Sequence, residues 1–166
     1  MPAASPMQKF KKGVDRVLAW TLTTLSAVLV IDVLWQIVSR YLLENPSSFT
    51  EELARFLLIW VGFLGASYAA GQRMHLAVDI LPNKMKGRKK VFLDVGLLLG
   101  GLVFVVAVMV FGGTRLVQDT FNFGQTAAAL QVPLGYVYIA LPLSGLLIVF
   151  YTFVQISEEW SKLKTL

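Results

Sequence analysis

Four apolar runs, each long enough to cross a lipid bilayer, dominate this sequence of 166 residues. They cover approximately residues 17–39, 53–71, 91–113 and 133–156. A membrane-spanning α-helix needs ~20 mostly apolar residues, because all backbone polar groups must be satisfied within the segment. Charged residues make up only 15% of the chain, whereas soluble domains carry roughly 25%. The sequence therefore predicts an all-α integral membrane protein with four transmembrane helices in a single domain, residues 1–166.

Lysine and arginine residues gather at one side of the predicted spans. Four lie in the N-terminal segment 1–16, and six lie in the 72–90 loop between the second and third runs. Basic segments stay on the cytoplasmic side, so both termini and this loop are predicted to be cytoplasmic. The first run is too long for a signal-peptide core, and we expect it to be a retained span. The net charge of +5 then matches membrane lipids as partners, and no nucleic acid is expected to bind.

The inventory of reactive side chains argues against an enzyme. The chain has no cysteine and one histidine, so thiolate metal sites, cysteine nucleophiles and a haem held between two histidines are excluded. A glycine-rich phosphate loop and a Gly-x-Ser-x-Gly turn are also missing from the sequence. We therefore expect no catalytic residues, no bound metal and no cofactor.

The single histidine, His75, stands four residues before Asp79 in the basic loop. Two side chains at this spacing on a helix can hydrogen-bond, so an acid–base pair in a membrane enzyme is one interpretation. No third group completes such a mechanism. The apolar residues around the pair favour a short helical segment at the cytoplasmic interface, which ends at Pro82. We interpret His75 and Asp79 as a structural polar clamp that fixes this segment.

Asp32 lies inside the first predicted span, a little outward of its centre. A carboxylate within the membrane is costly unless it is protonated, paired or next to water. It can be a packing carboxylate or can have an ion or proton role, and both interpretations are open. Helical spacing places several residues on the same face as Asp32, namely Thr21, Leu25, Val28, Trp35, Gln36 and Ser39. An alternative function follows from Asp32: an autonomous four-helix, proton-coupled multidrug exporter.

The outer connection between the first two runs reads ENPSSFTEELAR, residues 44–55. The spacing of Ser48 and Glu51 predicts a capping box at the start of the second helix. Glu51 and Arg55 stand four residues apart and are expected to pair on one helical face. We predict that Glu51, Glu52 and Arg55 form a partner interface at the outer end of the molecule.

Small residues in the second and third spans recur at spacings that let two helices approach closely. These predicted helix-packing positions are Gly62, Gly65, Ala66, Gly96 and Gly100. They are expected to pack either within the four-helix set or against another subunit. In the fourth span, Pro142 lacks a backbone N–H and predicts a kink.

The stretch TEELARFLLIWVGFLGASYAAGQRMHLAVDIL, residues 50–81, resembles the signature of the small membrane subunit of TRAP transporters, the DctQ-like family. The resemblance covers nearly the whole chain in the order of its motifs, its loop sizes and its inferred topology. The matching positions are Glu52, Leu53, Arg55, Trp60, Gly65, Ala66, His75, Leu76 and Val78, with Arg40 and Tyr41 before them and Pro133, Tyr138 and Pro142 after them.

The resemblance implies a scaffold role in a secondary importer of a bacterial or archaeal inner membrane. The small subunit of such a transporter pairs with a large many-span subunit as a heterodimer and works with a periplasmic substrate-binding protein. The large subunit holds the substrate and sodium sites, and the imported organic acid belongs to the dicarboxylate, keto acid or sialic acid class. By this resemblance the chain binds no substrate alone, and the function is expected to lie in its interfaces.

Overall fold

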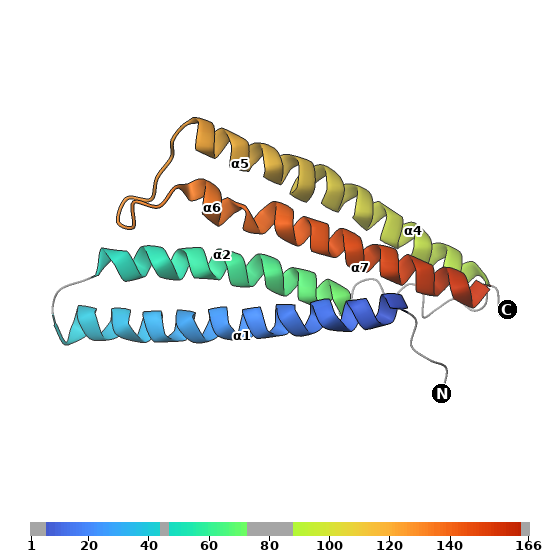
Figure 1. The fold of residues 1–166 in the computed structure, drawn as a ribbon, viewed down its shortest axis with the longest axis horizontal. Helices are drawn as coiled ribbons and strands as arrows, with labels where there is room; N and C mark the ends of the chain where they lie inside the picture. The colour runs from blue at the N-terminus through green and yellow to red at the C-terminus, as the bar shows by residue number, and fades with distance from the viewer. Residues whose placement is uncertain (1–5, 44–46, 73–87, 164–166) are drawn as a thin grey trace.

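The computed structural model describes residues 6–43, 47–72 and 88–163, which fold into long helices (Figure 1). Four helical stretches in these residues are long and apolar enough to cross a membrane. This confirms the prediction of an all-α membrane protein with four spans. The helices are α1 (Pro6–Tyr41), α2 (Ser48–Gly71), α4 (Arg88–Phe104), the π-helix η2 (Val105–Gly112), α5 (Gly113–Asn122), α6 (Leu134–Tyr138) and α7 (Ala140–Leu163).

Two helices extend well beyond the apolar runs that predict them. α1 begins at Pro6, so most of the basic segment 1–16 is helical, and α5 continues the third span to Asn122 instead of ending at 113. The added turns of α5 are polar, and the Thr120 hydroxyl donates to the Leu116 carbonyl one turn earlier. The helices thus continue past the apolar runs into more polar sequence.

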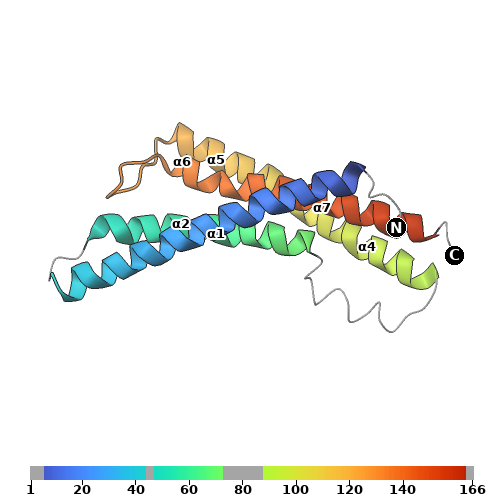
Figure 2. The same cartoon turned by 60° about the horizontal axis from the view of Figure 1, so that its bottom comes forward.

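The helices lie side by side with their connections at opposite ends (Figure 1). The C-terminal end of α1, the N-terminal end of α2 and the turn between α5 and α6 lie at one end. The N-terminal end of α1 and the C-terminal end of α7 lie at the other. α2 packs between α1 and α7, and α7 packs in turn on α4 and η2. Figure 2 shows that α1 runs obliquely to α2.

The packed core is small and lies where α1, α2 and α7 meet. Leu18, Leu64 and Tyr151 form its centre, and Trp60 and Phe150 are among the partly buried residues around it. The fourth span has 39% of its most apolar window buried, whereas the third span has only 6%. Apolar surface of this extent requires a covering medium. Lipid or another membrane chain must therefore cover most of the first and third spans.

Close contact between the third and fourth spans depends on two glycines. A Cβ at Gly145 would lie 2.9 Å from Cβ of Met109 in η2, and a Cβ at Gly113 would lie 3.0 Å from Cγ of Leu141. The widened turns of η2 therefore press directly on α7. The fourth span is interrupted at Ile139, between α6 and α7. Pro142 lies three residues later and has no N–H to donate to the Tyr138 carbonyl.

Candidate functional site

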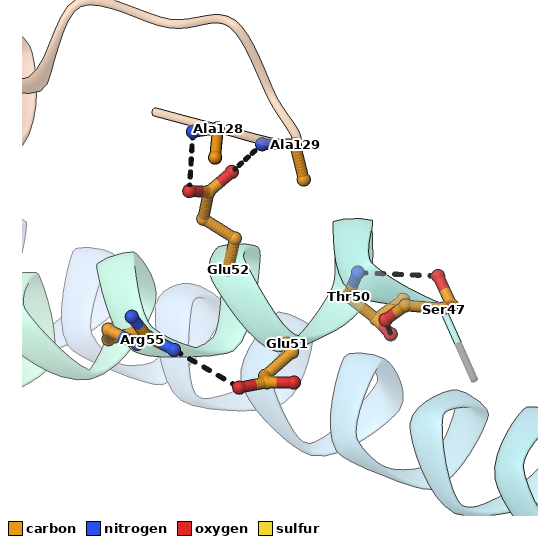
Figure 3. A network of polar contacts seen from close by, with 7 residues as sticks. All are labelled: Ser47, Thr50, Glu51, Glu52, Arg55, Ala128 and Ala129. Atoms are coloured by element: carbon orange, nitrogen blue, oxygen red, sulfur yellow. Dashed lines mark hydrogen bonds and ion pairs between the residues drawn. The ribbon is translucent and has the colours of Figure 1, made fainter. Parts of the chain in front are cut away.

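The end of the bundle that the sequence predicts to face outward is held together by the Glu52 carboxylate, near the start of α2. Three consecutive backbone N–H groups donate to this carboxylate: Ala128 to Oε1 at 3.0 Å, Ala129 to Oε2 at 2.8 Å, and Leu130 to Oε2 at 2.7 Å. Figure 3 shows the first two of these hydrogen bonds. Hydrogen bonds to a charged acceptor are stronger than those between neutral groups. Glu52 thus clamps the turn between the third and fourth spans onto the second span.

The turn itself is shaped so that these three donors point in one direction. The Gln131 N–H donates to the Ala127 carbonyl at 3.1 Å, which closes a single helical turn over 127–131. The first N–H groups of such a turn have no partner within it. Gln131 ends the turn with a φ of 55°, and an antiparallel bridge between Thr126 and Pro133 closes the base. The Glu52 carboxylate therefore caps this turn from a different helix.

The start of α2 differs by one residue from the predicted capping box. The N-cap is Ser47, whose hydroxyl oxygen accepts the N–H of Thr50 at 3.4 Å, so Ser48 is the first helical residue and does not pair with Glu51. Because Ser47 and Ser48 are adjacent, the sequence alone does not indicate which of them is the N-cap. Glu51 pairs with Arg55 at 3.1 Å, and both side chains are 65% exposed. The predicted outer group therefore divides: Glu52 binds the 127–131 turn, whereas Glu51 and Arg55 stay on the surface (Figure 3).

A second polar clamp lies at the opposite end of the molecule, between the first and fourth spans. The hydroxyl of Tyr151 donates to Oδ1 of Asp15 at 2.6 Å. Oδ2 of the same carboxylate pairs with the ammonium group of Lys11 at 2.9 Å. Lys11 also lies 5.5 Å from the centre of the Tyr151 ring, a distance at which a cation is attracted to an aromatic face. These three residues, named the inner clamp after the predicted cytoplasmic side, bind α1 to α7.

The second span joins this inner clamp through Gly71 and Ala70. A Cβ at Gly71 would lie 2.7 Å from Cε1 and Cζ of Tyr151, so only glycine leaves room for the ring at its present position. Next to it, Nε2 of Gln155 donates to the Ala70 carbonyl at 2.6 Å. All three packed spans of the core therefore meet at Tyr151. No sequence motif identified this cluster, because its members come from three helices.

Asp32 is buried on the face of α1 that packs against the bundle, with 7% of its surface exposed. Its Oδ2 atom has no hydrogen-bond partner among the residues that the structure describes. The residues predicted on the same helical face as Asp32 differ in burial within this chain. Ser39 is buried with Asp32, but Val28 and Trp35 are 42% and 54% exposed, and Thr21 is exposed too.

The predicted helix-packing glycines make no close helix contact within the described residues. A Cβ at Gly62, Gly96 or Gly100 would meet no atom within 4 Å, and one at Gly65 would just touch Leu22 at 4.0 Å. Ala66 is exposed as well. Packing of these positions against another subunit stays a prediction.

The other predicted polar clamp, His75 with Asp79, lies outside the described residues. Across the described ranges, no group of three histidine, aspartate or glutamate side chains is placed to hold a metal ion. Six hydrogen bonds in these ranges join segments far apart in the chain, and most of them belong to the two clamps that tie the ends of the bundle. Many large apolar side chains on the outside of the helices stay exposed within this chain.

Comparison with known proteins identifies the family of this chain. The family model for the DctQ component of tripartite ATP-independent periplasmic transporters matches residues 28–162. The chain belongs to this DctQ family. It is therefore a transporter component and not an enzyme, and a multi-pass protein of the inner membrane.

Three relatives differ in how much of their own length this chain covers. The chain is 28% identical over 142 residues to the sialic acid TRAP transporter small permease protein SiaQ of Vibrio cholerae, across 86% of this chain and 79% of SiaQ. It is 30% identical over 140 residues to the sialic acid TRAP transporter permease protein SiaT of Haemophilus influenzae, across 84% of this chain and 22% of SiaT. It is 28% identical over 121 residues to the isethionate TRAP transporter permease protein DctMQ of Oleidesulfovibrio alaskensis, across 70% of this chain and 19% of DctMQ.

The last two relatives are much longer than this chain, which corresponds to about a fifth of each. In those proteins a DctQ-like segment is covalently joined to a large remainder of the same permease. A large membrane component therefore accompanies the DctQ unit.

Proposed function

We propose that this chain is the small scaffold subunit of a TRAP-type secondary importer. It pairs with a large many-span subunit as a heterodimer and works with a periplasmic binding protein. The single observation that carries this proposal is the DctQ family match over residues 28–162. The imported compound is an organic acid, and its uptake is driven by sodium through the large subunit.

The exposure of the spans supports pairing with a large membrane chain. Only 11% of the most apolar window of the first span and 6% of that of the third are buried within the chain. Both lie at the margins of the bundle, where they flank the packed α2 and α7. A large subunit that covers one of these margins leaves the other to lipid. The fused relatives SiaT and DctMQ support such a permanent association.

The outer clamp supports a docking role for the periplasmic end. Glu52 holds the 127–131 turn, and the exposed Glu51–Arg55 pair lies on a different face of the same helix. Three hydrogen bonds already order this turn. A partner that binds it therefore does not lose binding free energy to ordering the turn. We infer that Glu51, Arg55 and this turn contribute to the surface that meets the binding protein.

The substrate belongs to the partner chains in this proposal. The two relatives with the same identity of 28% are named for sialic acid and for isethionate, two different compounds. The sequence identity between a relative and this chain therefore does not indicate which compound the transporter carries. The dicarboxylate, keto acid or sialic acid class is retained as the proposed range. The autonomous exporter that uses Asp32 is not favoured, because the family match concerns a transporter component.

Co-purification tests the pairing. The chain, tagged at one end, is expressed with the many-span permease encoded beside it, and the complex is analysed on native gels. We expect a complex with one copy of each subunit that survives gentle detergents. A homodimer that forms without the permease and binds cationic dyes would contradict the proposal and restore the exporter.

A further inference from the structure

The Asp32 carboxyl group differs from the other buried polar side chains of the described residues. Its Oδ2 atom is the one buried side-chain oxygen or nitrogen in the described ranges that makes no hydrogen bond. Ser67 and Gln155 are buried to a similar degree, and each donates to a backbone carbonyl of another helix. Buried polar groups in native proteins nearly always have a partner. The exception at Asp32 points to a hydrogen-bond donor on another molecule.

The depth of Asp32 in the membrane excludes lipid as the source of this donor. The apolar run 17–39 has its middle at residue 28, and Asp32 lies four residues beyond it, which on a helix is about 6 Å along the axis. The hydrocarbon core extends about 15 Å to either side of its centre. Asp32 therefore lies among acyl chains, which carry no hydrogen-bond donor. A carboxyl group at this depth needs a protein group or water as its partner.

Asp32 lies at the edge of the face of α1 that packs on α2. Leu29 and Gln36, on one side of Asp32 at helical spacing, are partly buried. Val28 and Trp35, on its other side, are 42% and 54% exposed. A helix of another chain that packs along Val28 and Trp35 would run directly beside the Asp32 carboxyl group.

We propose that Asp32 is the polar contact point for the large membrane subunit on the first span. A transmembrane helix of that subunit packs along the edge marked by Val28 and Trp35, and one of its side chains donates a hydrogen bond to the Asp32 carboxylate. An ionised carboxylate only accepts hydrogen bonds, so the partner side chain is a donor. This inference rests on the proposed pairing and adds which margin of the bundle the large subunit covers.

The third span, at the opposite margin, lacks a comparable contact point. Its most apolar window is only 6% buried, yet none of its described residues has a buried side-chain oxygen or nitrogen without a hydrogen bond. Acyl chains can cover such a helix and leave no polar group unpaired. The third span is therefore the margin left to lipid.

Photo-cross-linking locates the large subunit on α1. Benzoylphenylalanine replaces either Val28 or Val30, the two subunits are expressed together, and the membranes are irradiated. Val30 is the matched control, because it is 57% exposed and lies two residues further on, on the opposite side of the helix. We expect an adduct of the two subunits from position 28 and several-fold less from position 30.

The affinity of the two subunits tests the hydrogen bond itself. Energy transfer between labelled subunits, titrated in liposomes, gives the dissociation constant. Asp32→Leu should weaken the complex about tenfold or more, the usual effect of losing a hydrogen bond to a charged group. Thr23→Leu is the control, because Thr23 is exposed, bonds only to Ala19 of its own helix, and lies nine residues away on the opposite face. Its dissociation constant should equal that of wild type. The melting temperature of each variant alone verifies that it is folded.

Three results would overturn the inference and leave the pairing of the subunits intact. Adducts that form equally from both positions, or mainly from position 30, would place the large subunit on another surface. An unchanged dissociation constant in Asp32→Leu would show that the carboxylate does not contact the partner. Equal weakening by Asp32→Leu and Thr23→Leu would mean that α1 tolerates no change. Absence of any wild-type complex on native gels would instead overturn the pairing, and this inference with it.

Discussion

The hydroxyl of Tyr151 donates a hydrogen bond of 2.6 Å to Oδ1 of Asp15, which joins the fourth span of this DctQ protein to the first at the end of the bundle where α1 begins. The Tyr151 ring is completely buried at the centre of the packed core. The same residue therefore supplies both an apolar body to the core and a polar contact at the membrane surface.

Removal of this hydroxyl tests the inner clamp. Tyr151→Phe keeps the ring and deletes the bond to a charged acceptor, so we expect a loss of about 1.5–3 kcal/mol in the free energy of unfolding. Denaturation in detergent, followed by circular dichroism, measures it. Tyr136→Phe is the control, because Tyr136 is 56% exposed. If Tyr136→Phe lowered the free energy of unfolding as much as Tyr151→Phe, the hydrogen bond to Asp15 would not be a specific source of stability.

A methyl group at Gly71 should force the core apart. The new Cβ would lie 2.7 Å from the Tyr151 ring, and overpacking of this kind costs about 1–3 kcal/mol. We expect Gly71→Ala to lower the melting temperature of the purified chain. Gly62→Ala, on the same helix with nothing within 4 Å, should leave it unchanged or slightly raised. If the two variants melt at the same temperature, Tyr151 does not occupy its present position.

The outer clamp is tested by exchange of backbone amide hydrogens. Glu52→Gln replaces one acceptor oxygen by an N–H₂ group that faces other donors, so the amides of residues 128–130 should exchange several-fold faster. Glu51→Gln is the matched control, because Glu51 pairs only with Arg55 in the described contacts. Mass spectrometry of the peptide that contains the turn reports the rate. Unchanged protection in Glu52→Gln would show that the carboxylate does not hold the turn.

The buried carboxyl group of Asp32 should lower the stability of the chain purified alone. Its Oδ2 atom is buried without a donor among the described residues, and a buried polar group that lacks a partner costs stability. We expect Asp32→Leu to raise the melting temperature of the chain purified alone. A lower melting temperature in Asp32→Leu would mean that the carboxyl makes a stabilising contact.

The sequence predicted those features that depend on local composition. The four spans and the Glu51–Arg55 pair follow from apolar run length and helical spacing, and the structure shows both. The role of Glu52 could not be predicted in this way. Its partners are the backbone N–H groups of two alanines and a leucine, and backbone donors leave no side-chain signature in a sequence.

The close helix approaches were equally hard to predict. Small-residue spacing pointed to Gly62 and Gly100, whereas an added Cβ would collide with a neighbouring residue at Gly71, Gly135 and Gly145. Whether a glycine is needed depends on which large side chain of another helix faces it, such as Phe121 beside Gly135. That information lies in the tertiary arrangement. The contact between Asp15 and Tyr151, 136 residues apart in the chain, is of the same kind.

Uptake by proteoliposomes tests the scaffold proposal most directly. The large subunit is reconstituted with or without this chain, a sodium gradient is imposed, and entry of the labelled organic acid is measured after addition of the binding protein with its ligand. We predict uptake only when the chain, the large subunit and the binding protein are all present. We also predict slower uptake with Glu52→Gln than with wild type. Full uptake by the large subunit and binding protein without this chain would contradict the account.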